Sequence, residues 1–494
     1  MTEIDRKKRR HRNERIAAAL IVLIAAAALA ATLMYTRRET EQLAHQTTYV
    51  PRQLKMTPEA KLLQEYVRID TSNPPGNELP AAQWLAGMIA KAGVPTEIIE
   101  PAPRRANLYV RIKGKRPGEG LLLLHHMDVV PAIGTWTRPP FAAEIYFNQI
   151  YGRGTLDMKG TGICELRAFL DVAESGRTPE RDIVFLAVAD EEAGSALGTK
   201  WLIEHRPDIF EGIRYAINEG GITEMMQEKV RYYGIEIGTK QIVTLELEGP
   251  SRSQLQQARI ALEPWFVSRE PQRISPEVKR WMHDLGPQRI AFRDQLLDID
   301  AAAAAGRFWD LPVGYREMTQ DNVWADNVEE HGGRWRMRTY LLNLPDTDPD
   351  QRIEWLRGKV APFGVRVGEV LRKEGPVPVT SDQTPFFRLM AAEAARAYGA
   401  PVGTEMLNKW FNDSRFLRKR GIAAYGLDPF PIDYFQSETI HSTDERVRVD
   451  YFAQGVEFLR RVVMAYAFTE VTQSVRETPQ KPSESPSRAA SEKR

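Results

Sequence analysis

Two short runs of apolar residues constrain the fold of this 494-residue chain more than any other feature. They span residues 121–124 and 183–189, and a stretch with helical spacing, 162–175, lies before the second run. A run without polar residues is typical of a strand that is buried on both faces, and such strands occur in parallel sheets covered by helices. The alternation of strand and helix therefore predicts an α/β fold.

The sequence pattern changes near residue 241. Residues 242–247 and 334–344 alternate between apolar and polar side chains, which predicts antiparallel strands with one solvated face. Segments of the first kind resume at 385–398, 422–426 and 451–467. We therefore predict an α/β catalytic domain in two parts, 56–240 and 373–470, with an α+β domain inserted at 241–372. The length of the chain also favours more than one folded unit.

The N-terminal segment predicts a membrane anchor. A basic stretch, 1–15, precedes an uncharged apolar run, 16–35, which is about long enough to cross a hydrocarbon core of ~30 Å. The positive-inside tendency places 1–15 in the cytoplasm and the body in the periplasm or outside the cell. A cleaved signal peptide is the alternative interpretation. Residues 36–55 are interpreted as a tether, and 471–494, which are poor in large apolar side chains, as a disordered tail.

Charge and cysteine content limit the classes of function. The chain has 67 Lys and Arg residues against 66 Asp and Glu, so it lacks the positive field expected of a nucleic-acid-binding protein. The single cysteine, Cys164, excludes an intrachain disulfide and a zinc site built on several thiolates. Any metal ion must therefore be bound by histidines and carboxylates.

Ionisable side chains follow both apolar runs directly. His126 and Asp128 come after the first run, and Asp190, Glu191 and Glu192 come after the second. Parallel strands end at one edge of a sheet, where α/β proteins bind their ligands, so these groups are expected to lie together. A carboxylate such as Asp128 can fix the tautomer of a neighbouring imidazole. A structural His–Asp pair and a solvated acidic loop are the alternatives.

Three further residues extend this candidate site. The glycine-rich turn at 151–160 fits neither the dinucleotide-binding nor the P-loop pattern, which leaves Asp157 available as a metal ligand. Glu219 follows another short apolar segment, and His441 lies far downstream. Two histidines with several carboxylates suit zinc, and also cobalt or manganese.

Several motifs occur in the order and spacing of one protein family. They are Thr71-Ser72-Asn73-Pro74-Pro75-Gly76-Asn77-Glu78, His126-Met127-Asp128-Val129-Val130-Pro131, residues 152–160, Asp190-Glu191-Glu192-Ala193-Gly194-Ser195 and Asn412-Asp413-Ser414-Arg415. Over about residues 55–470 the chain resembles the dinuclear-zinc peptidases and aminoacylases, which include glutamate carboxypeptidase, aminoacylase and acetylornithine deacetylase. It looks most like the carboxypeptidase S branch.

The resemblance implies a three-layer α/β/α zinc-hydrolase domain with an inserted domain that serves as a lid and in dimerisation. It also implies that Asp157 bridges two zinc ions. His126 and Glu219 would complete one metal site, and Glu192 and His441 the other. A homodimer through the insertion is a further expectation from the family.

The resemblance also assigns the catalytic groups. Asp128 would orient His126, and Glu191 would be the general base that deprotonates a water held between the two metal ions. Arg415 is a candidate for a two-pronged contact with a substrate carboxylate, with a surface salt bridge as the alternative. The expected reaction is hydrolysis of the amide bond in short peptides or N-acyl amino acids that carry a free carboxylate.

The insertion departs from the family pattern. The family normally has a Gly-Gly-His-Ser-type turn whose histidine reaches the developing oxyanion, but the matching stretch, 248–253, lacks a histidine and ends in Arg252 and Ser253. Loss of an oxyanion donor typically costs ~10²–10³ in rate. Arg252 is a candidate replacement, and Asn327 is a candidate for the family's lid asparagine. A noncatalytic, metal-dependent protein that binds peptides or acyl amino acids is therefore the alternative function.

Overall fold

The computed structural model describes residues 56–266, 272–289, 291–407 and 412–469. The expected cytoplasmic segment (1–15), membrane anchor (16–35), tether (36–55) and disordered tail (471–494) lie outside these residues. Across the described ranges, every helix is too short or too polar to cross a bilayer.

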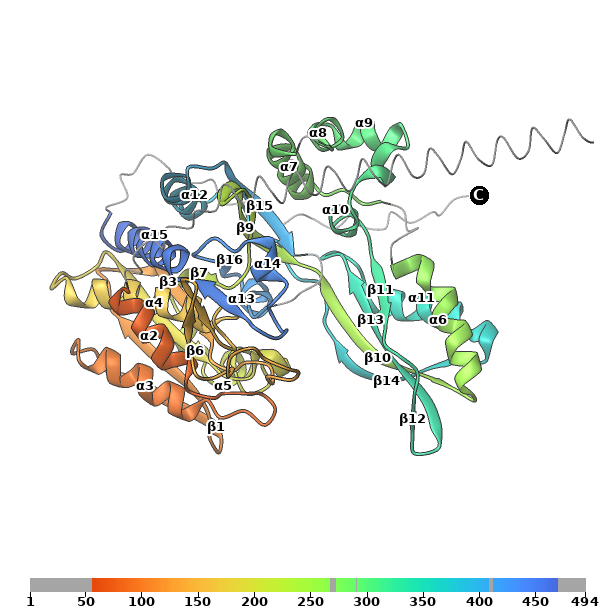
Figure 1. Cartoon of the computed structure of the whole chain (residues 1–494), viewed down its shortest axis with the longest axis horizontal. Coiled ribbons are helices and arrows are strands. Elements are labelled where there is room, and N and C mark those ends of the chain that lie inside the picture. Colours follow the sequence, from red (N-terminus) through yellow and green to blue (C-terminus); the bar gives the residue numbers. More distant parts are fainter. Residues whose placement is uncertain (1–55, 267–271, 290, 408–411, 470–494) are drawn as a thin grey trace, which may run out of the picture. The chain divides into compact units, whose positions relative to one another are not determined.

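The largest sheet of the described chain has nine strands and is parallel at its centre (Figure 1). β3 (Arg116–His126) lies between β6 (Arg181–Val188) and β7 (Ile213–Asn218), and all three run in the same direction. β16 (Ala423–Gly426) is parallel to β7 on the far side. The remaining strands are β1 (Glu97–Ala102), β2 (Arg105–Ile112), β8 (Ile222–Met226), β9 (Lys229–Thr239) and β15 (Val402–Leu407).

Helices cover both faces of this sheet. Leu121, Leu123 and Phe185 face one core together with the buried sides of five helices, whereas Leu122 and Val184 face a second core. The first group of helices is α2 (Pro58–Val67), α3 (Leu79–Ala90), α4 (Lys159–Glu174), α12 (Pro385–Tyr398) and α15 (Val449–Phe468). The second is α5 (Thr199–His205) and α13 (Ser414–Lys419). The expected α/β class is confirmed.

A second, antiparallel sheet follows directly in the chain. β9 ends at Thr239 and the next strand, β10, begins at Gln241. The strands of this sheet are β10 (Gln241–Gly249), β11 (Asn322–Ala325), β12 (Glu329–His331), β13 (Arg334–Asn343) and β14 (Arg366–Lys373). The helices α6 (Arg252–Phe266) and α11 (Pro349–Val360) cover its apolar face. Its alternating burial follows the alternation in the sequence.

Part of the predicted insertion belongs to the core of the first sheet instead. Trp281, Met282 and Phe308 are buried in the same cluster as Leu121 and Phe185. The short helices that carry this region are α7 (Pro276–Leu285), α8 (Arg293–Leu297), α9 (Ile299–Ala304) and α10 (Val313–Glu317), of which α7 packs against β15. The segment between β10 and β11 thus serves both sheets.

A small third sheet lies next to the glycine-rich turn. It consists of β4 (Ile145–Tyr146), β5 (Gln149–Tyr151) and β17 (Arg446–Arg448), in the order β17-β5-β4. The short helix α14 (Tyr434–Ser437) lies just before the loop that carries His441, and β17 lies just after it. Pairing of β17 with β5 therefore brings this late segment of the chain to the turn that carries Asp157.

Candidate metal centre

The central parallel strands deliver most of the site to one edge of the sheet. β3 ends at His126, which pairs with Val188 at the end of β6. Glu191 and Glu192 follow β6 in a short 3₁₀ turn, and Glu219 follows β7. The carboxyl edge of the sheet thus gathers one imidazole and three carboxylates, as expected from the order of strands.

Asp157 lies between the two histidines. Its Oδ1 is 3.0 Å from Nε2 of His126, and its Oδ2 is 2.8 Å from Nε2 of His441. Nε2 of His126 is also 3.6 Å from Glu219, and Nε2 of His441 is 3.3 Å from Glu192. The structure therefore brings all five predicted ligands together, with Asp157 presenting one oxygen to each half of the site.

Asp128 supports His126 and the acidic turn at the same time. Nδ1 of His126 is 2.9 Å from the main-chain oxygen of Asp128 and 3.6 Å from its carboxylate. The same carboxylate accepts hydrogen bonds from the main-chain N–H groups of Glu191 and Glu192, at 3.1 and 3.2 Å. A proton on Nδ1 that faces the carbonyl leaves Nε2 for a metal ion. The orienting contact is thus made first by the main chain of Asp128.

Two supporting residues, Asn73 and Arg105, were given no role from the sequence, and they bind Asp190 of the acidic triplet. Nδ2 of Asn73 donates to Asp128 at 2.9 Å and to Asp190 at 3.1 Å, and the guanidinium of Arg105 binds Asp190 at 2.8 Å. Asp190 has a positive φ of 69°, an unusual conformation for a residue other than glycine. Asn73 lies in the first family motif, which is the one signal in the sequence that points to it.

The surrounding carboxylates favour the protonated, positively charged form of both histidines. Burial alone would lower the pKa of His126, but the carboxylates around it, Glu219 first, outweigh burial and raise that pKa well above its usual range. Burial would also lower the pKa of His441, but the hydrogen bonds to Asp157 and Glu192 outweigh burial and raise that pKa to about 11. A site that holds protons this strongly on imidazoles is one that also favours cations.

The acidic side chains respond to burial and to one another. Burial, followed by the charges of Glu219 and Asp413, raises the pKa of Glu191 well above its usual range. Burial also raises the pKa of Glu219 to about 7, with His126 opposing and Asp157 reinforcing the rise. Several carboxyl groups this close cannot all be ionised without a compensating charge.

The donor set fits a pair of divalent metal ions. Two groups of ligand atoms, His126 with Glu191 and Glu219, and His126 with Asp157 and Glu192, each lie within 4.8 Å of one another. Within the described ranges, Oε1 of Glu191 and Oε1 of Glu192 are buried and accept no hydrogen bond. Imidazole and carboxylate ligands of this kind suit zinc, cobalt or manganese.

Arg415 lies behind the predicted general base and is fully buried. Its Nε is 2.9 Å from Oε1 of Glu374, and its Nη1 is 3.6 Å from Oε1 of Glu191. Nη1 also donates to the main-chain oxygen of Asn412 at 2.6 Å. The guanidinium is therefore engaged by the protein, and the salt bridge considered as its alternative role is present but buried rather than on the surface.

The two candidate residues from the insertion, Arg252 and Asn327, lie on the surface of the second sheet's part of the chain. Arg252 is the first residue of α6, and Asn327 lies between β11 and β12; both side chains are exposed. In the part of the chain that the structure describes, no hydrogen bond or ion pair joins either residue to the five ligands. Their roles toward a substrate stay predictions.

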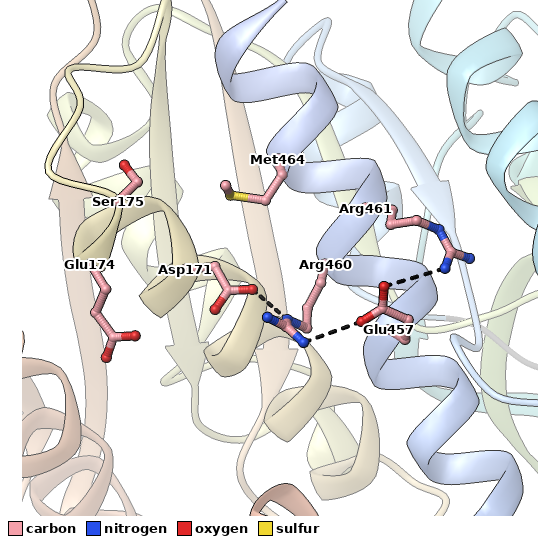
Figure 2. A pocket seen from close by; sticks show the side chains of 7 residues that line it. All are labelled: Asp171, Glu174, Ser175, Glu457, Arg460, Arg461 and Met464. Atoms are coloured by element: carbon pink, nitrogen blue, oxygen red, sulfur yellow. Dashed lines mark hydrogen bonds and ion pairs between the residues drawn. The ribbon is translucent and has the colours of Figure 1, made fainter.

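A pocket of about 380 Å³ between α4 and α15 is separate from this centre (Figure 2). Four of its five charged side chains pair with one another: Arg460 binds Asp171 and Glu457, and Arg461 binds Glu457 at 3.4 Å. The full lining is Asp171, Glu174, Ser175, Glu457, Arg460, Arg461 and Met464. None of the predicted ligands lines it.

An α/β fold with this group of candidate ligands at the carboxyl edge of its sheet is typical of metal-dependent hydrolases. The sequence profile of the peptidase family M20/M25/M40 matches residues 122–465, which is more than half of the chain. The protein therefore belongs to the M20/M25/M40 peptidase family. This confirms, at the level of the family, the resemblance found in the sequence motifs and the expectation of a hydrolase.

Individual relatives show how far this similarity extends. A probable succinyl-diaminopimelate desuccinylase of Staphylococcus aureus is 35% identical over 134 residues, which is 27% of this chain and 32% of the relative. The M20 metallo-carboxypeptidase Sso-CP2 of Sulfolobus solfataricus matches with a TM-score of 0.62 and 19% identity, over 83% of this chain and 100% of that one. Human carnosine dipeptidase 1 matches with a TM-score of 0.63 and 12% identity, over 83% and 96%. At these identities the two structures show a shared fold only.

Proposed function

We propose that the protein is a zinc-dependent amidohydrolase that uses two metal ions, with cobalt or manganese as alternatives. The observation that carries this proposal is the position of Asp157, whose two carboxylate oxygens face His126 and His441 separately. A carboxylate in this position suits a bridge between two cations, with Glu219 and Glu192 as the outer ligands.

The chain's own residues would divide the work of hydrolysis. Bound zinc supplies Lewis acidity, which polarises a carbonyl and makes water more acidic. Glu191, buried beside the ligands and raised in pKa, would take the proton of the attacking water and pass it to the leaving nitrogen. The carboxylate of Asp128 accepts a hydrogen bond from the main-chain N–H of Glu191, which holds the turn that carries this base in place.

The proposed substrates are short peptides or N-acyl amino acids that carry a free carboxylate. The relatives support this class by their names: one is a probable desuccinylase, and the solved structures are a metallo-carboxypeptidase and a dipeptidase. The chain matches only about a third of the desuccinylase, so the nature of the acyl group is itself part of the proposal.

A panel of dipeptides and N-acyl amino acids, assayed with the zinc-loaded full-length protein, tests this function. Glu191→Gln should lower kcat by about 10²–10⁴ because a positioned general base contributes roughly that factor. Zinc content should stay near two equivalents in both proteins. Equal turnover by the wild type and Glu191→Gln would refute the mechanism, and no turnover of any substrate would refute the function.

The second candidate is a metal-dependent binding protein without turnover. It is favoured by the turn at 248–253, where the exposed residues Arg252 and Ser253 stand in place of the family's histidine. Tight ligand binding by calorimetry with no product at any zinc, cobalt or manganese loading would support it. Turnover that Arg252→Ala abolishes would instead show that Arg252 serves the reaction.

We further propose that the protein is anchored in the inner or plasma membrane with its catalytic body in the periplasm or outside the cell. The basic stretch at 1–15 and the apolar run at 16–35 support this. Full-length protein should stay in the membrane fraction after carbonate extraction, and added protease should reach the body from the outer side only. Release into the soluble fraction would contradict the anchor and favour a cleaved signal.

A further inference from the structure

A buried carboxylate that belongs to none of the predicted ligands ties two parts of the metal centre together. Oε1 of Glu445 accepts the main-chain N–H groups of Leu156, at 2.8 Å, and of Asp157, at 3.2 Å. The main-chain oxygen of Glu445 accepts the N–H of Gly152 at 2.8 Å. Glu445 therefore fixes the backbone of the turn from which the bridging Asp157 projects.

The other oxygen of Glu445 reaches the His441 loop through Arg153. Nη1 of Arg153 donates to Oε2 of Glu445 at 2.6 Å, and Nη2 donates to the main-chain oxygen of Ser442 at 2.9 Å. Arg153 and Glu445 are 1% and 0% exposed, and the ring of Trp136 lies 5.2 Å from the guanidinium. A charged pair with so little water around it keeps a fixed geometry.

The loop that Arg153 holds is strained at His441 itself. His441 has a φ of 59°, a left-handed conformation that residues with a side chain adopt at a cost. Such a conformation persists where the surrounding contacts enforce it. The hydrogen bond from Arg153 to Ser442, the next residue, is one such contact.

We propose that Glu445, acting with Arg153, is a positioning residue that holds Asp157 and His441 in register for the second metal ion. The proposal rests on the proposed dinuclear function. His126 is held by other residues, because its Nδ1 faces the main-chain oxygen of Asp128 and Asn73 donates to the Asp128 carboxylate. Of the ligands that Glu445 and Arg153 hold, Asp157 faces both halves of the centre, whereas His441 belongs to one half alone. Loss of Glu445 should therefore weaken metal binding at the Glu192–His441 half more than at the His126–Glu219 half.

Glu445→Gln tests this asymmetry in the full-length protein. An amide has one acceptor oxygen, so it cannot accept both the N–H groups of the Asp157 turn and the guanidinium of Arg153. We expect one zinc ion to bind as in the wild type and the second to bind about 10–100-fold more weakly, measured by chelator competition and metal analysis. We also expect kcat, lowered at limiting zinc, to recover with excess zinc.

Asp182→Asn is the matched control. Asp182 accepts Nη1 of Arg111 at 3.0 Å and the N–H of Gly114 at 2.8 Å, so it combines a guanidinium with a main-chain donor at the opposite end of β6. This variant should lower thermal stability without changing either zinc affinity. If Glu445→Gln fails to fold, Arg153→Lys provides the same comparison, since one ammonium replaces the two-pronged contact.

The results separate the inference from the function it rests on. Wild-type protein that binds fewer than two zinc ions would refute the dinuclear function. A wild type with two zinc ions, together with a Glu445→Gln variant that binds both as tightly, would overturn only the inference. Equal weakening of both sites in that variant would also overturn it.

Discussion

His125 precedes the predicted ligand His126, yet it serves a different, fully buried network. Its Nδ1 is 3.1 Å from Oε2 of Glu165, and its Nε2 is 3.2 Å from the hydroxyl of Tyr66. Burial, reinforced by His126, lowers the pKa of His125 to about 3, and burial raises the pKa of Glu165 well above its usual range. Both pKa shifts are explained if Glu165 is protonated and His125 is neutral. The carboxyl group of Glu165 then donates to Nδ1 of His125, and the Nε2–H group of His125 donates to the hydroxyl of Tyr66.

This assignment makes stability depend on pH through Glu165. The folded protein keeps the proton of Glu165, whereas the unfolded chain releases it above a pKa of about 4.5. The contribution of Glu165 to the free energy of unfolding is therefore complete below that pH and is lost as pH rises. Glu165→Gln cannot release a proton. The free energy of unfolding of the variant should therefore rise relative to that of the wild type by up to about 1.4 kcal/mol per pH unit above pH 4.5.

Urea unfolding of both proteins at pH 5, 6 and 7 measures this difference. His125 contributes equally to both, because its depressed pKa adds stability above about 6.5 that is lost toward pH 3 in either protein. A difference between the two proteins that stays constant with pH would mean that Glu165 is ionised in the fold.

Asp128 supports a second prediction at the scale of single residues. Asp128→Asn removes one acceptor from the N–H groups of Glu191 and Glu192 and adds a donor that faces them. We expect a loss of about 10–100-fold in zinc affinity or in kcat/KM, measured across a zinc titration. Asp70→Asn is the control, because Asp70 is exposed and, among the residues that the structure describes, accepts hydrogen bonds from Ser72 alone. Wild-type values in Asp128→Asn would show that the main-chain contact to His126 suffices.

At the scale of elements, helix α4 can approach β3 because Gly162 leaves room for the His125 ring. A Cβ at Gly162 would lie 2.6 Å from Cδ2 of His125. Gly162→Ala should therefore lower the free energy of unfolding by about 1–3 kcal/mol, as overpacked cores do. Gly87→Ala in α3, where a Cβ would meet no atom within 4 Å, should instead raise it by up to about 1 kcal/mol. Thermal melts that shift equally in both variants would contradict this packing.

The strand ends explain why so much of the site could be predicted from the sequence. Strand β3 ends in His126, and β6 leads into Glu191 and Glu192, so apolar runs followed by ligands indicated the edge of the sheet. The elements at 385–398 and 334–344 were also predicted, because caps and alternation mark them locally. The local sequence pattern was sufficient for residues whose position depends on a single helix or strand.

Contacts between distant segments could not be predicted in this way. Glu445 and Arg153 are 292 residues apart in the chain, and Glu374 meets Arg415 from the end of the second sheet. Helix α7 looked like part of the insertion, yet Trp281 is buried in the first core. Which partner a buried charge or an apolar face finds depends on tertiary packing, and spacing along the chain does not report it.

For the molecule as a whole, the metal centre gathers segments from both parts of the catalytic domain. Asp157 precedes α4, whereas His441 lies close to the C-terminal helix α15. A ligand that binds the folded state alone stabilises it by mass action. Cations bound between these segments should therefore raise the stability of the fold that brings the two parts of the domain together.

Removal of metal should consequently destabilise the whole catalytic domain. At a free zinc concentration of about 1,000 times the dissociation constant, binding adds roughly 4 kcal/mol to the free energy of unfolding. We expect chelation to lower Tm by several degrees and added zinc to restore it, followed by scanning calorimetry of the full-length protein. Asp157→Asn removes the carboxylate that faces both histidines, so its Tm should respond to neither chelator nor zinc. A wild-type Tm that is insensitive to chelation would mean that the gathered carboxylates are balanced by protons on His126 and His441 alone, and that no cation contributes to the stability of the fold.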